Sequence, residues 1–164
     1  MKTLYIVRHA KSDWGHEGLT DFERPLNSRG QSDAPRMGAI LKDFQAAPKL
    51  IRASAANRAI TTARLLASAL DYPLESIQVD SGMYGAGLQE IVSIIRNLPE
   101  DAHEVMLVGH NPTMQMTAQA LGGFHGENLP TCGIFCIDFA VDNWGEAAAS
   151  QGTIRYFEYP KKHR

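Results

Sequence analysis

Short apolar runs alternate with segments of helical periodicity along most of the chain, and this alternation leaves few folds open. Apolar runs at residues 4–7 and 104–108 are typical of buried strands, residues 49–53 form a short strand candidate, and residues 76–80 could form a brief strand. After each run, apolar residues recur every three or four positions, which predicts helices at residues 28–44, 57–70, 88–98 and 112–121. This order favours an α/β fold with a mostly parallel central sheet and helices on both faces, in three layers.

The C-terminal part of the chain predicts a different strand pairing. Residues 133–140 and 153–159 read as two strands joined through residues 143–152, and we expect them to form an antiparallel hairpin at one edge of the sheet. The chain has 164 residues, of which 44% are apolar, a size and composition that suit a single core. We therefore expect one domain spanning residues 1–164.

Two irregular features lie between the first strand and the second. Residues 13–27 are polar and rich in turn formers, which predicts a long loop, and long loops in compact domains are often functional. Pro35 falls within the first predicted helix, where it would either kink the helix or delay its start.

The charge balance excludes several kinds of partner. Sixteen basic against eighteen acidic side chains give a net charge of -2, so no general attraction to nucleic acid or to an anionic membrane is expected. The first apolar run is too short for a signal-peptide core and runs straight into charged residues. We expect a cytoplasmic protein, and a monomer, because no heptad stripe or long exposed apolar helix is apparent.

The first predicted strand ends in Arg8 and His9, an arrangement that suits phosphate chemistry. An imidazole can attack phosphorus, while a guanidinium holds phosphoryl oxygens through two parallel hydrogen bonds. The pair occurs by chance in many sequences, so its significance depends on the residues farther along the chain.

Two more strand-to-helix junctions carry residues of the same types. Arg58 falls in the first turn of a predicted helix, where an anion would also meet exposed amide groups, although a solvated surface arginine is the alternative. His110 follows Gly109 at the end of another strand, the edge of a parallel sheet where ligands bind. Taken alone, His110 would sooner be interpreted as a hydrogen-bonded structural histidine or a helix cap than as a ligand-binding residue. Four such residues at three junctions together favour a site.

These residues resemble the motifs of the histidine phosphatase superfamily, in its phosphoglycerate-mutase-like branch. The resemblance spans about two thirds of the chain and is carried by Arg8-His9-Ala10, Arg24-Pro25-Leu26-Asn27-Ser28-Arg29-Gly30, Ser54 with Arg58-Ala59 and Thr62, and Val108-Gly109-His110-Asn111-Pro112. The small size and the second and last of these motifs are most similar to the SixA-type phosphohistidine phosphatases. Ala10 stands where the family usually has glycine, and Ala55 where proline is frequent.

The resemblance implies a phosphoglycerate-mutase-like fold and a role for each matching residue. His9 would accept the phosphoryl group, while Arg8, Arg58 and His110 would bind it and Arg24 would add a contact. Ser12 could donate a hydrogen bond to phosphate or cap a local turn. No metal or other cofactor is expected, because fixed cationic groups around phosphorus can supply the stabilisation.

The sequence lacks a carboxylate that many family members carry after the third strand as a general acid. Residues 81–88 contain no acidic residue, and Asp80 and Glu90 only flank this gap, so neither is assigned. Phosphohistidine has a leaving group that needs little protonation, so the gap favours phosphohistidine or acyl-phosphate-like substrates, and we expect a phosphohistidine phosphatase acting on a phosphorylated protein. The alternatives are a small-molecule phosphomonoesterase of the same family, acting on a small phosphate compound, and a weakly catalytic phosphate-binding or phosphoprotein-binding module.

Overall fold

The computed structural model describes residues 1–126 and 128–164 and contains a six-stranded sheet with the order β3-β2-β4-β1-β5-β6. The strands are β1 (Lys2–Arg8), β2 (Leu50–Ser54), β3 (Gln78–Asp80), β4 (Glu104–Gly109), β5 (Ile134–Phe139) and β6 (Thr153–Glu158). The pairs among β1 to β4 are parallel, whereas β5 runs antiparallel to both β1 and β6. The mostly parallel sheet with an antiparallel edge hairpin is therefore confirmed.

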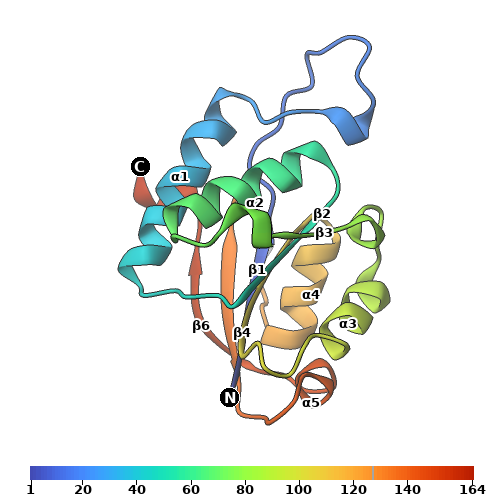
Figure 1. Cartoon of the computed structure of the whole chain (residues 1–164), viewed down its shortest axis with the longest axis vertical. Helices are drawn as coiled ribbons and strands as arrows, with labels where there is room; N and C mark the ends of the chain where they lie inside the picture. The colour runs from blue at the N-terminus through green and yellow to red at the C-terminus, as the bar shows by residue number, and fades with distance from the viewer. Residues whose placement is uncertain (127) are drawn as a thin grey trace.

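Helices cover both faces of the sheet (Figure 1). They are α1 (Ser28–Asp43), α2 (Asn57–Ala69), α3 (Leu88–Arg96), α4 (Thr113–Gly122) and α5 (Trp144–Ala148), with short 3-10 helices at Asp21–Glu23, Leu74–Ser76, Ser81–Met83 and Pro160–His163. The α1 and α2 helices pack on one face, and α3, α4 and α5 contribute to the core on the other. The predicted three-layer α/β arrangement is confirmed.

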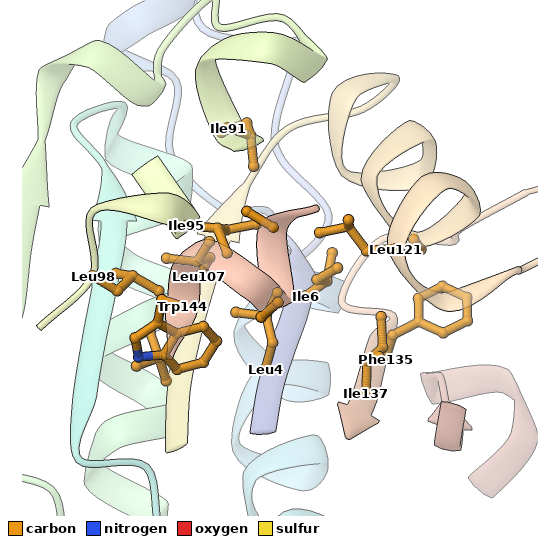
Figure 2. Close-up of a cluster of buried hydrophobic side chains, with 14 of the residues drawn as sticks. Leu4, Ile6, Ile91, Ile95, Leu98, Leu107, Leu121, Phe135, Ile137 and Trp144 are labelled. Carbon is orange, nitrogen blue, oxygen red and sulfur yellow. The ribbon is translucent and has the colours of Figure 1, made fainter. Parts of the chain in front are cut away.

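Strand β1 separates two apolar cores because its side chains alternate between the faces of the sheet. Leu4 and Ile6 belong to the core under α3, α4 and α5, whereas Tyr5 and Val7 belong to the core under α1 and α2. Figure 2 shows Leu4 and Ile6 in the first of these cores. Burial on both faces explains why the run from residue 4 to residue 7 is continuously apolar.

Helix α1 begins at Ser28, directly after its Asn27 cap, and not after Pro35. The Asn27 side chain accepts a hydrogen bond from the amide of Gly30 at 2.9 Å, which satisfies one of the free amides of the first turn. Pro35 lies inside the helix, so the alternative of a delayed start was wrong.

Helix α5 lies in the link between β5 and β6 and was not predicted. It has five residues, too few for a periodic apolar pattern, and begins at an Asn143 cap that accepts from the Glu146 amide at 2.8 Å. Its first residue, Trp144, is fully buried. The helix lies at the end of the molecule opposite the loop of residues 11–27 (Figure 1).

The parallel register brings the carboxyl ends of three strands to one edge. Arg8, the last residue of β1, pairs with Gly109, the last residue of β4, and Ser54 ends the neighbouring β2. The segments that leave these strands begin side by side, and the loop of residues 11–27 extends from the same edge (Figure 1). In the described part of the chain, no helix combines the length and the apolar character needed to span a membrane.

Candidate active site

A cavity of about 370 Å³ opens at this edge of the sheet. The residues predicted for the site all line it, and the full lining is Arg8, His9, Lys11, Ser12, Trp14, Asp21, Arg24, Arg58, His110, Asn111 and Thr131. Residues from widely separated parts of the sequence therefore share one hollow.

His9 is held with one ring nitrogen committed to the backbone. Its Nδ1 lies 2.7 Å from the carbonyl oxygen of Ala10. A carbonyl oxygen only accepts hydrogen bonds, so Nδ1 carries the proton and the lone pair of the neutral ring resides on Nε2. Only 8% of His9 is exposed, and its ring lies 5.3 Å from the ring of His110 between centroids.

The surroundings of His9 keep its imidazole neutral. Burial lowers the pKa of His9 to about 3, and the nearby His110, Arg58 and Arg8 also lower it, against the opposing effect of the bond to Ala10. At neutral pH the ring therefore retains a lone pair that could attack an electrophile.

Arg58 and Arg8 are anchored differently. Arg58, which is 7% exposed, donates from Nη1 to the backbone carbonyl of Asp21 at 2.7 Å and from Nη2 to the Asp21 carboxylate at 3.0 Å. Arg8 donates from Nη1 to the Leu129 carbonyl at 3.0 Å, while its buried Nε has no hydrogen-bond partner among the described residues. Burial also lowers the pKa of Arg8.

His110 faces the end of the adjacent strand. Its Nε2 lies 2.8 Å from Oγ of Ser54, and its Nδ1 is buried without a partner in residues 1–126 and 128–164. Burial lowers the pKa of His110 to about 4, with a further lowering by Arg58 and an opposing effect of Asp21. Both cavity histidines are thus neutral at pH 7.

Arg24 and Ser12, both in the loop of residues 11–27, line the cavity. Arg24 donates from Nη2 to the Ser12 hydroxyl in a short hydrogen bond, from Nε to the Asp13 carbonyl at 3.1 Å, and from Nη1 to the Asp21 carboxylate at 2.7 Å. The guanidinium carbon lies 3.3 Å from the ring centroid of Trp14, which is 80% exposed. These contacts hold a cation at the rim of the cavity.

Sequence reasoning missed Asp21, the carboxylate of this cavity. Its Oδ2 accepts from the Tyr84 hydroxyl at 2.7 Å, in addition to the bonds from Arg24 and Arg58. The Tyr84 hydrogen bond makes the largest contribution to lowering the pKa of Asp21, desolvation opposes it, and the bonds from Arg24 and Arg58 add to the lowering, which brings the pKa to about 2. Asp21 stands three residues before Arg24 in the loop predicted to be functional, a spacing that could have signalled the pair.

A family model for the histidine phosphatase superfamily (branch 1) matches residues 4–83. A chloroplastic protein of Arabidopsis thaliana, described as uncharacterised, is 30% identical over 161 residues, which cover 92% of this chain and 72% of that protein. The chain belongs to the histidine phosphatase superfamily. A 2,3-bisphosphoglycerate-dependent phosphoglycerate mutase of Mycobacterium leprae is 32% identical over 102 residues, covering 57% of this chain and 41% of the mutase.

Solved structures of histidine phosphatases share the whole fold. A candidate phosphohistidine phosphatase SixA from Agrobacterium tumefaciens is 29% identical and superposes with a TM-score of 0.83, covering 97% of this chain and 98% of that one. A protein histidine phosphatase SixA complexed with tungstate has a TM-score of 0.84 at 19% identity, with 99% of each chain covered. The protein is thus a phosphatase with the phosphoglycerate-mutase-like α/β fold.

The carboxylates that flank the gap after the third strand of this histidine phosphatase do not line the cavity. Asp80 accepts a hydrogen bond from the Gly82 amide at 2.8 Å and so caps a 3-10 helix. Glu90 is exposed in the first turn of α3. The carboxylate beside the arginines and histidines comes from the loop after β1 instead.

Proposed function

We propose that this histidine phosphatase transfers a phosphoryl group to Nε2 of His9 and then to water, without a metal ion. The hydrogen bond from His9 Nδ1 to the Ala10 carbonyl carries the proposal, because it fixes the tautomer whose Nε2 can attack phosphorus. The low pKa of His9 keeps that nitrogen unprotonated.

Arg8, Arg58 and His110 bind the transferring phosphoryl group in this proposal, and Arg24 and Ser12 contact its outer side. The charge of such a group spreads over its three equatorial oxygens during transfer, so donors from several directions stabilise it. The buried Nε of Arg8 and Nδ1 of His110, unpartnered among the described residues, supply unused hydrogen-bonding capacity next to the cavity.

The substrate class that we propose is a phosphohistidine, carried on a protein. When the P–N bond of phosphohistidine breaks, its electron pair returns to an imidazole that leaves as a neutral ring, whereas an alkyl ester leaves as an alkoxide that needs a proton. Asp21, the carboxylate lining the cavity, is ionised at neutral pH and has no proton to give.

The cytoplasmic location and the monomeric state stay predictions.

Peptides that differ only in the phosphorylated residue test this substrate class. We expect kcat/KM for a histidine-phosphorylated peptide to exceed that for the same sequence phosphorylated on serine by about 100-fold or more, the usual contribution of general-acid assistance. Release of inorganic phosphate measures both. Equal rates, or a preference for phosphoserine, would favour the small-molecule phosphomonoesterase and reject the phosphohistidine assignment.

The protonation state of His9 is open to direct measurement by imidazole ¹⁵N NMR. We expect the His9 ring to stay neutral, with its proton on Nδ1, from pH 8 down to pH 5, because its pKa of about 3 lies below that range. A His9→Gln variant assigns the signal by its loss. A His9 ring that gains a proton near pH 6.5, the value of an unperturbed histidine, would contradict this expectation.

A further inference from the structure

The Asp21 carboxylate bonds to three residues from different parts of the chain, Arg24, Arg58 and Tyr84. One oxygen of its carboxylate accepts from Arg24, and the other accepts from both Arg58 and Tyr84. Tyr84 in turn packs edge-on against His110, with ring centroids 5.7 Å apart, and against Phe22 at 5.0 Å. Asp21 is therefore fixed beside the residues proposed to hold the phosphoryl group.

We propose that Asp21 is the general base that activates the water attacking phospho-His9. The inference rests on the proposed function, since it presupposes that the phosphoenzyme forms. Its basis is geometric: the Asp21 carboxylate lines the same cavity as His9 and lies 3.0 Å from a guanidinium nitrogen of Arg58. A water molecule that bonds to this carboxylate would stand next to a phosphoryl group held by Arg58.

The step balances without any other reactant. The water oxygen forms a bond to phosphorus as the bond between phosphorus and Nε2 of His9 breaks, and the electron pair of that bond returns to Nε2. One water proton passes to the Asp21 carboxylate, and the product is inorganic phosphate. The proton on Nδ1 of His9 stays there throughout, hydrogen-bonded to the Ala10 carbonyl, so the ring is regenerated in its neutral form.

The contacts of Asp21 explain how the carboxylate is held and how it becomes available. The Tyr84 hydroxyl and Arg24 orient the two carboxylate oxygens independently of Arg58. When a phosphoryl oxygen takes a hydrogen bond from Arg58, the Oδ2 atom loses one donor and can accept from water. The withdrawal of that donor and the added negative charge also make the carboxylate more basic.

A purely electrostatic role predicts the opposite result. If Asp21 served only to occupy Arg58 in the free enzyme, it would compete with the substrate phosphate for that guanidinium. Its removal would then tighten phosphate binding and leave the hydrolysis of phospho-His9 unchanged or faster. The two roles therefore differ in sign and can be separated by one variant.

The test is Asp21→Asn, which removes the base and keeps the size, assayed with p-nitrophenyl phosphate, whose leaving group needs no acid. We expect steady-state kcat to fall about 100-fold. The initial burst of p-nitrophenolate should equal the enzyme concentration, and acid-labile, base-stable phosphate should accumulate on His9. Added formate should restore part of the turnover of Asp21→Ala by replacing the missing carboxylate.

Glu23→Gln is the matched control, because Glu23 lies in the same short helix, its side chain bonds to Thr20 and to no other residue in the described part of the chain, and it is not among the residues that line the cavity. Its kcat should equal that of the wild type. The inference is overturned if Asp21→Asn accumulates no phospho-His9, whatever its turnover. It is also overturned if formate does not restore turnover of Asp21→Ala. A wild-type enzyme that never forms phospho-His9 would instead overturn the proposed function.

Discussion

His9→Ala is expected to lower the hydrolysis of p-nitrophenyl phosphate at least about 1,000-fold, because it removes the nucleophile of the proposed reaction. The remaining cavity would still bind phosphate through Arg8 and Arg58, so binding of inorganic phosphate should persist. Steady-state release of p-nitrophenolate and calorimetric titration with phosphate measure the two effects. The result would separate catalysis from a module that only binds phosphorylated ligands.

The exposed His16 provides the control for this loss, since it belongs to the neighbouring loop and does not line the cavity. We expect His16→Ala to keep wild-type turnover. Circular dichroism and thermal unfolding should show that His9→Ala is folded, because the mostly buried ring is replaced by a smaller side chain. Turnover within tenfold of the wild type in a folded His9→Ala protein would reject His9 as the nucleophile.

Trp144→Ala is expected to lower the free energy of unfolding by about 3–5 kcal/mol, the range for truncating a buried aromatic residue to alanine. The indole is fully buried, and its Nε1 donates to the Ala102 carbonyl at 2.9 Å. Figure 2 shows it with Leu98 and Leu107 in the core under α3 and α5. The variant would leave a cavity and an unpaired carbonyl, and urea denaturation measures the loss.

Trp144→Phe should lower the free energy of unfolding by less, about 1–3 kcal/mol, because it keeps most of the apolar volume. The remaining loss comes from the missing hydrogen bond to Ala102. Leu74→Ala, at a position that is 48% exposed, should stay within about 0.5 kcal/mol of the wild type. A loss below about 1 kcal/mol for Trp144→Ala would contradict the packing described here. Because α5 lies at the end of the molecule opposite the loop of residues 11–27 (Figure 1), and that loop contributes to the cavity lining, activity per folded molecule should not change.

Periodicity predicted the larger elements of the fold because the apolar positions that define them are local. The alternation of strands and helices specified the parallel sheet, and residues 133–140 and 153–159 correctly indicated the edge hairpin. Helix α5 was not predicted, because its stability depends on the tertiary contacts of Trp144 and on the Asn143 cap and not on a repeating apolar pattern. Short elements of this kind carry little signal in the sequence.

Site residues that follow strands could be placed from chain order alone, whereas Arg24 of the loop was predicted only through the resemblance to the family. Arg8 and His110 lie at the carboxyl ends of neighbouring parallel strands, so the topology alone brings them together. Asp21 belongs to the loop of residues 11–27 that contributes to the cavity lining, and its neighbours Arg58 and Tyr84 lie 37 and 63 residues away. No local pattern specifies such a path.

The sequence by itself determined the α/β class and the positions of two histidines and two arginines at strand-to-helix junctions, since both depend on periodicity and chain order. Only the tertiary structure decided which carboxylate meets them and which nitrogen of His9 keeps its lone pair. The physical reason is that a proton position and an ion pair depend on distances of a few ångströms between segments remote in sequence. Those distances are set by the packing of the loop of residues 11–27 and the surrounding elements against one edge of the sheet.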